Sequence, residues 1–171
     1  MSDWLSPIVS MKQRQIFLKL AWTALLFTGC GNKESVPGTA GPETVSTITI
    51  EGNDRMRFSP DHFAVKAGET IQLTLKNAGT MPKETMGHNL VIIEPGVSPI
   101  AFATAAVRHP DKAYVAPEYG DRIIAAAGVL GPGESEIITC IAPAKADDYP
   151  FVCTFPGHTQ AGMKGNMTVI E

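Results

Sequence analysis

The sequence predicts an all-β fold, a two-sheet β-sandwich with one short helical insertion. Segments that alternate apolar and polar residues, such as residues 71–76, recur between turns rich in Gly, Pro and Asn. One Ala-rich segment, residues 98–108, has helix-start residues and interrupts the strands once. Strands at this spacing with a single helical interruption favour a sandwich.

The predicted strands are short and follow one another along the chain. In residues 71–76, Ile71, Leu73 and Leu75 face the core, and the residues between them face water. The segment opened by His88 is instead a continuous apolar run, which also indicates a strand. The full set of predicted strands covers residues 45–50, 58–66, 71–76, 88–93, 122–130, 134–142, 149–153 and 165–170.

The helical insertion is predicted from its ends as well as its composition. Ser98 suits the N-cap and Pro99 the first helical position, because that position needs no backbone N–H donor. Pro110 limits the far end of the helix. We expect the residues up to Asp121 to form a flap outside the sheets.

The first 30 residues are predicted to be a secretory signal. Lys12, Arg14 and Lys19 precede an apolar run at residues 20–27 that is too short to span a bilayer as a stable helix. A buried core helix is the alternative interpretation of this run. Export is the better interpretation, and it places the protein in the periplasm or on a membrane facing it.

The end of this leader resembles the bacterial lipobox, at which cleavage leaves a lipid-modified cysteine as the new N-terminus. Small residues lead into Gly29-Cys30, although Phe27 stands where the lipobox usually has Leu. A plainly cleaved leader and an uncleaved one therefore stay open. On the lipobox interpretation, Cys30 would anchor the protein to a membrane.

A flexible tether is predicted at residues 31–46, because Gly, Pro, Ser and Thr dominate there and large apolar side chains are almost missing. Residues 47–171 then form one domain, large enough to bury about two thirds of its unfolded surface without disulfide bonds. The chain carries a net charge of −3, and its first 29 residues carry +2, so the exported part carries −5. Such an acidic domain is not expected to bind nucleic acid.

Three possible metal ligands lie within eleven residues near the C-terminus. They are Cys153, His158 and Met163, spaced as Cys-x4-His-x4-Met. One thiolate, two imidazoles and a long axial thioether are the ligands of blue-copper sites, so one further histidine is needed. His88, at the start of an apolar strand, is the candidate for this second imidazole. Singly, each of these residues is better explained by core packing, and it is their combination that predicts copper.

Met86-Gly87-His88-Asn89 together with the later CTFPGH and MKG segments resembles the azurin and auracyanin branch of the cupredoxins. The resemblance runs from about Thr47 to the C-terminus and implies a cupredoxin-like Greek-key β-sandwich. It also implies one type 1 copper ion that carries single electrons, with His88, Cys153, His158 and Met163 as ligands. The Gly87 carbonyl would lie opposite Met163, although a purely conformational role for Gly87 is equally open.

The resemblance further implies contacts around the copper ligands. Asn89 would join the Thr154 region, and the Phe155 N–H would approach the Cys153 sulfur. Azurins have three residues between the loop His and Met, whereas this chain has four, as auracyanin does. The His158 side chain would reach the surface through an apolar patch, where redox proteins would dock briefly. The residues that would form this patch are Met81, Met86, Pro156 and Ala161.

The remaining cysteine and histidines are interpreted as structural. Cys140 is expected to be a small buried residue on a strand, and His62 and His109 to be solvated surface residues. A copper enzyme would need more histidines for a second, catalytic copper, so no enzymatic activity is predicted. Zinc is disfavoured because Met is a poor zinc ligand. The main alternative is a copper carrier or chaperone without redox function.

Overall fold

The computed structural model describes residues 44–171 of the 171-residue chain. The predicted signal, the lipobox at Cys30 and nearly all of the predicted tether lie outside the described residues. The first strand, β1 (Val45–Asn53), begins two residues before the domain boundary expected from the sequence. No helix in the part of the chain that the structure describes is long and apolar enough to cross a membrane.

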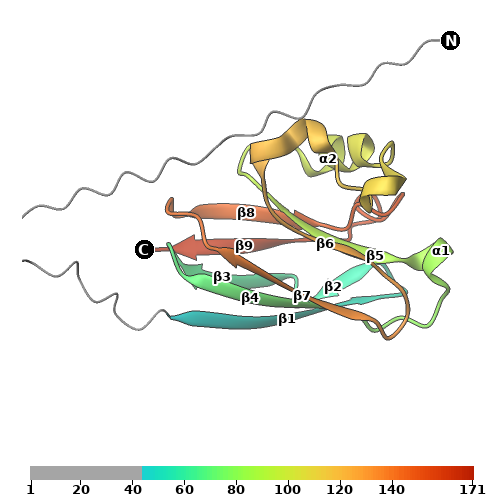
Figure 1. Ribbon diagram of the computed structural model, residues 1–171, viewed down its shortest axis with the longest axis horizontal. Helices are drawn as coiled ribbons and strands as arrows, with labels where there is room; N and C mark the ends of the chain where they lie inside the picture. The colour runs from blue at the N-terminus through green and yellow to red at the C-terminus, as the bar shows by residue number, and fades with distance from the viewer. Residues whose placement is uncertain (1–43) are drawn as a thin grey trace, which may run out of the picture. The chain divides into compact units, whose positions relative to one another are not determined.

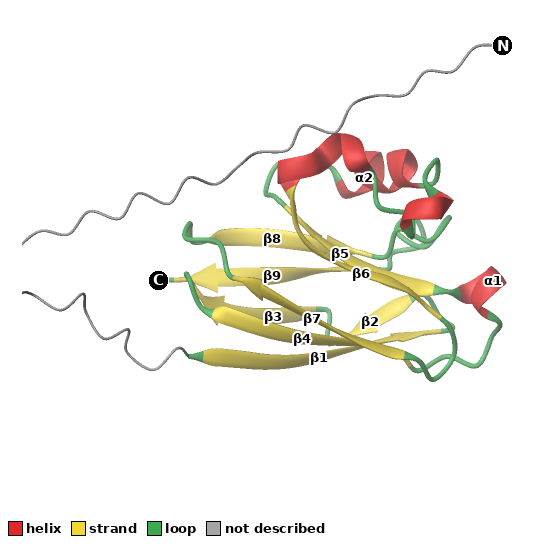
Figure 2. Cartoon of the chain, viewed as in Figure 1, coloured by secondary structure: helices red, strands yellow, loops and turns green. Residues whose placement is uncertain are grey.

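Within residues 44–171, nine strands form two sheets that pack face to face (Figures 1 and 2). One sheet has the strand order β2-β1-β4-β7, and the other β3-β9-β8-β5-β6. The β1/β4 and β3/β9 pairs are parallel, and the other pairs are antiparallel. The bounds of the strands after β1 are β2 Arg57–Ser59, β3 His62–Lys66, β4 Thr70–Asn77, β5 His88–Ile93, β6 Ile123–Leu130, β7 Ser135–Ile141, β8 Asp147–Val152 and β9 Lys164–Ile170.

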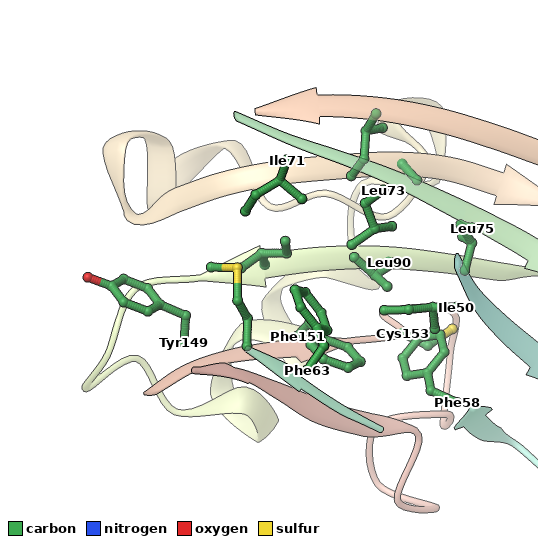
Figure 3. Close-up of a cluster of buried hydrophobic side chains, with 14 of the residues drawn as sticks. Ile50, Phe58, Phe63, Ile71, Leu73, Leu75, Leu90, Tyr149, Phe151 and Cys153 are labelled. Atoms are coloured by element: carbon green, nitrogen blue, oxygen red, sulfur yellow. The ribbon is translucent and has the colours of Figure 1, made fainter. Parts of the chain in front are cut away.

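The main core lies between the two sheets. As the alternation in the sequence predicts, Ile71, Leu73 and Leu75 on β4 are fully buried. They face residues of the opposite sheet, such as Leu90 on β5 and Phe151 on β8 (Figure 3). Each such side chain contributes about 1.5–3 kcal/mol when it is fully buried, so the core supports the domain without disulfide bonds.

Strand β5 is buried along its whole length because both of its faces are covered. Leu90 and Ile92 pack in the main core, while Val91 and Ile93 pack in a second cluster with Phe102. Phe102 belongs to α2 (Pro99–Ala106), which lies over the β8-β5-β6 sheet (Figure 1). This coverage explains why the β5 sequence is a continuous apolar run without alternation.

The helix prediction is confirmed at its start, where the Ser98 side chain accepts a hydrogen bond from the Ala101 N–H. The sequence did not reveal three shorter helical turns, α1 (Lys83–Met86) and the 3-10 helices η1 (Pro110–Lys112) and η2 (Pro117–Arg122). Turns of three to six residues are too short to show helical periodicity. The η1 and η2 turns lie within the predicted flap.

The prediction for Cys140 was wrong. Its side chain packs against the main core but is only partly buried, because β7 is the edge strand of its sheet. Partial burial still raises the pKa of the Cys140 thiol.

Candidate metal centre

Three buried donor side chains meet at one end of the sandwich. His88 and Cys153 are fully buried, and His158 is 3% exposed. The Nδ1 atoms of His88 and His158 lie 3.3 Å apart, and Cys153 Sγ lies 3.4 Å from His158 Nδ1. Among the residues from 44 onward, these three form the group of His, Cys or acidic side chains close enough to hold one metal ion.

The sheet brings His88 and Cys153 together although they are 65 residues apart. Strands β5 and β8 are antiparallel neighbours in which Val91 pairs with Val152. The start of β5 and the end of β8 therefore lie at the same edge, with His88 on one strand and Cys153 just after the other. Figure 3 shows Cys153 at one end of the core cluster and Tyr149, on β8, at the other.

The loop between β8 and β9 holds its own shape by hydrogen bonds. The His158 N–H donates to the Phe155 carbonyl, and the Met163 N–H donates to the His158 carbonyl at 2.9 Å. The Cys153 N–H donates to the Met163 carbonyl and closes the loop at its base. Gly162, at φ +100°, supplies a backbone conformation that other residues rarely adopt. The loop thus places His158 and Met163 before any ion binds.

Asn89 joins the two ligand-bearing segments, as predicted. Its side-chain oxygen accepts a hydrogen bond from the Thr154 N–H at 2.7 Å, and its amide donates to Thr154 Oγ1 at 2.6 Å. The same amide group donates to the Ala113 carbonyl in the flap. Asn89 and Thr154 follow His88 and Cys153 directly, so these bonds fix the spacing of two donor residues.

Burial keeps the three donors uncharged in the absence of an ion. It raises the pKa of the Cys153 thiol to about 12, although the backbone N–H groups of Asn89 and Phe155 partly oppose this shift. The Phe155 N–H thus lowers the pKa of the Cys153 thiol, in line with the approach to the sulfur that the resemblance implied. Burial and the neighbouring His88 lower the pKa of His158 to about 4. Burial likewise lowers the pKa of His88, and the Asn53 carbonyl partly offsets this.

These residues fit a single transition-metal ion. Such an ion lies about 2.0 Å from an imidazole nitrogen and about 2.3 Å from a thiolate sulfur, so donors around it are about 3.3–3.7 Å apart. The separations of 3.3 Å between the two Nδ1 atoms and 3.4 Å between Cys153 Sγ and His158 Nδ1 both lie within that range. A cation at this point would also stabilise the ionised thiol that burial otherwise disfavours.

Met163 is fully buried next to this group. A Cβ added to Gly52, at the end of β1, would lie 2.9 Å from the Met163 methyl group and 3.0 Å from His88 Cδ2. Gly52 therefore leaves the space in which Met163 and the His88 ring sit. The sequence did not single out Gly52, because a glycine in a strand carries no donor atom and only the tertiary contact reveals its role.

Gly87 is buried and sterically confined. A Cβ there would lie 2.6 Å from both the Lys83 carbonyl and Val129 Cγ1, and 3.1 Å from the Phe155 ring. Its φ of −64° is an ordinary value, so close packing rather than an unusual conformation requires glycine here.

The other two histidines in the described residues lie outside the group. His62 is exposed on β3 and its Nε2 lies 2.9 Å from Thr168 Oγ1. His109 is partly buried, and its Nε2 lies 3.1 Å from a Glu118 carboxylate oxygen. His62 is thus a surface residue as predicted, whereas His109 is less solvated than expected because the flap packs beside it.

Comparison with known proteins identifies the family. Residues 44–170 match the model of the copper binding proteins of the plastocyanin/azurin family. The chain belongs to this family. It is 42% identical over 126 residues to outer membrane protein H.8 of Neisseria gonorrhoeae, covering 72% of this chain and 67% of that protein. It is 38% identical over 127 residues to an azurin of Pseudomonas denitrificans, covering 72% of this chain and 97% of the azurin.

Solved structures agree with this assignment to the cupredoxins. An auracyanin from Roseiflexus castenholzii superimposes with a TM-score of 0.66 at 36% identity, over 75% of this chain and 99% of that one. The Greek-key β-sandwich prediction is therefore confirmed. Copper is the cofactor of this cupredoxin, and His88, Cys153 and His158 form its metal-binding group. Cupredoxins are typically electron-transfer proteins and not enzymes.

Proposed function

We propose that this chain is an exported mononuclear type 1 copper protein that carries single electrons between redox partners. The observation that carries the proposal is the buried group of one thiol and two imidazoles with donor atoms 3.3–3.4 Å apart. A thiolate and two imidazoles suit an ion that alternates between Cu(I) and Cu(II). Bound copper would supply a reversible one-electron change.

Met163 would complete the proposed ligand set, and the Gly87 carbonyl would supply a further, weak donor. The support for Met163 is its complete burial and the position of its methyl group against Gly52, beside the His88 ring. The support for Gly87 is its place directly before His88 and the close packing that fixes its backbone. A thioether at this position favours copper over zinc, for which Met is a poor ligand.

The residues around the metal centre hold the donor side chains in fixed positions, so these side chains would move little when the copper changes oxidation state. His88 and Cys153 extend from paired strands, and Asn89 and Thr154 fix their spacing. The N–H groups of Asn89 and Phe155 stabilise negative charge on the Cys153 sulfur. A site held in this way changes little between the two oxidation states, and a small structural change favours fast electron transfer.

Redox partners are proposed to dock over His158. The ring lies just beneath the surface at 3% exposure, and not at the surface as the sequence suggested. Of the residues expected to form the apolar patch, Pro156 and Ala161 are exposed, Met81 is 41% exposed and Met86 is half-buried. A small apolar patch of this kind suits brief contacts, in which rapid release matters more than affinity.

Export is proposed from the leader, and membrane attachment from Cys30. One relative is named an outer membrane protein, which is consistent with a membrane-tethered form of this chain. Mass spectrometry of the mature protein from a bacterial host would test both points. A lipidated N-terminal Cys30 is expected, whereas an intact leader or a cleavage site elsewhere would contradict the anchor.

Voltammetry of the copper-loaded protein separates electron transfer from the alternative, a non-redox copper carrier. A reversible one-electron wave that persists over many cycles is expected, because the donor residues are held in place before any ion binds. Loss of copper to a Cu(I) chelator on reduction, with no reversible wave, would favour the carrier instead. The Met163→Leu variant serves as a comparison, because it removes the thioether and leaves the other three donors.

A further inference from the structure

One positively charged side chain that is not a proposed copper ligand, Arg57, forms a hydrogen bond to the loop between β8 and β9. Arg57, on β2, donates from Nη1 to the Ala161 carbonyl at 2.8 Å and to the Met56 carbonyl at 2.7 Å. The first bond joins residues 104 positions apart in the sequence. Bonds from a guanidinium are charge-assisted and stronger than bonds between neutral groups.

The Ala161 carbonyl accepts no hydrogen bond from the described residues of its own loop. The loop's internal hydrogen bonds from residues 161–163 end on the carbonyls of Gly157, His158 and Thr159. The Ala161 carbonyl instead takes its donor from outside the loop. A Cβ at Gly162 would lie 3.4 Å from Arg57 Nη1. Arg57 therefore contacts the two residues that directly precede Met163.

The β1–β2 turn, which leads into Arg57, is stabilised by hydrogen bonds to Asn53. Across the β1–β2 turn, Arg57 pairs with Asn53, whose carbonyl accepts from the Met56 N–H at 2.9 Å. The Asn53 side chain also accepts from the Arg55 N–H. Gly52, at the base of this turn, lies against the Met163 methyl group and the His88 ring. The β1–β2 turn thus contacts this part of the loop in two places. Gly52 lies against the Met163 side chain, and Arg57 binds the backbone just before Met163.

We propose that Arg57 is a positioning residue that fixes Met163 by holding the Ala161–Gly162 backbone. The proposal rests on the proposed function, because it treats Met163 as the axial ligand. Without this bond, the last part of the loop would be secured only by its own hydrogen bonds. The axial side of the copper site would then be less well defined.

Arg57 could instead influence the copper only through its positive charge, without positioning anything. Arg57→Lys keeps the charge but has a shorter side chain without the Nη1 group that bonds both carbonyls. Arg57→Met keeps the aliphatic length and loses both charge and bonds. Arg55→Met is the matched control, because Arg55 is exposed in the same turn and its side chain makes no hydrogen bond in the described structure.

Hydrogen exchange of the copper-free protein tests the contact with the loop. The Gly162 and Met163 amides, both hydrogen-bonded within the loop, should exchange about tenfold faster in Arg57→Met, the change expected from losing one charge-assisted bond. Arg57→Lys should lie between Arg57→Met and wild type, and Arg55→Met should match wild type. Equal exchange in Arg57→Met and Arg55→Met would overturn the proposal.

Visible and electron paramagnetic resonance spectra of the copper-loaded variants test the action through Met163. Arg57→Met should shift the spectra in an otherwise unchanged protein and have no further effect in a Met163→Leu background. A full shift in that background would mean that Arg57 acts on copper by its charge alone, which overturns the proposal. If the wild-type protein lacks a sulfur-to-copper band, the proposed function fails, whereas the exchange result still reports on the Arg57 contact.

Discussion

Asn89 and Thr154 are joined by two reciprocal hydrogen bonds of 2.6 and 2.7 Å. Each residue directly follows a donor residue of the metal centre, His88 in one case and Cys153 in the other. Both side chains are fully buried, so water cannot replace either bond. This pair sets the separation of the two strands at the point where the thiol and the first imidazole meet.

Replacing Asn89 by Leu should therefore be costly. The buried Thr154 N–H and Thr154 Oγ1 would lose their Asn89 partners, and the half-buried Ala113 carbonyl would lose its donor; each buried unsatisfied group costs about 1–3 kcal/mol. Denaturant unfolding of the copper-free protein should show a loss of about 3 kcal/mol or more. Asn166→Ala, at an exposed asparagine on β9, is the control and should change stability by less than about 0.5 kcal/mol. Equal stability of the two variants would show that the Asn89 bonds contribute little.

The copper-free protein should lose stability in mild acid. The pKa of His158 is about 4 when folded, below the unfolded value of about 6.5, so the unfolded chain binds more protons between these values. Stability should be steady above about pH 7 and fall by up to about 3 kcal/mol as the pH drops from about 6.5 to about 4. The lowered pKa of His88 acts in the same direction.

Urea unfolding at a series of pH values measures this dependence. His158→Asn removes one of the two imidazoles and should flatten the curve between pH 6.5 and 4. Identical curves for wild type and variant would contradict the assignment of the acid sensitivity to His158.

Gly87→Ala should destabilise the fold. The added methyl group would lie 2.6 Å from a backbone oxygen and from Val129 Cγ1, and overpacking of this kind typically costs about 1–3 kcal/mol. Gly131→Ala is a matched control, because its nearest contact, with Lys83 Cβ, is at 3.2 Å, whereas two contacts at Gly87 are at 2.6 Å. Thermal unfolding should rank Gly87→Ala clearly below Gly131→Ala, and the reverse order would contradict the packing at Gly87.

The sequence predicted the parts of the fold whose local pattern agrees with the final structure. The alternation in residues 71–76 specified β4, and the Ser98-Pro99 pair specified the start of α2. The predicted ligands Cys153, His158 and Met163 lie close together in the chain and were visible as a motif. His88 was visible because it opens an apolar strand within Gly-His-Asn.

The rest depends on contacts between distant segments. Gly52 and Arg57 carry no pattern that points to a metal, and their roles follow only from their contacts with Met163 and the Ala161 carbonyl. Cys140 was expected to be buried because its strand is apolar, but the position of β7 at a sheet edge leaves it only partly buried. Neither sheet order nor edge position can be read from one strand's sequence.

The visible absorption spectrum of the Cu(II)-loaded domain, recorded beside that of a Cys153→Ser variant, tests whether the buried thiol is bonded to copper. The wild-type protein should show an intense sulfur-to-copper charge-transfer band, because Cys153 Sγ lies with both imidazoles in one group of donor atoms. The variant should still fold but lose this band. A variant that kept the band at wild-type intensity would show that copper is bound by other residues.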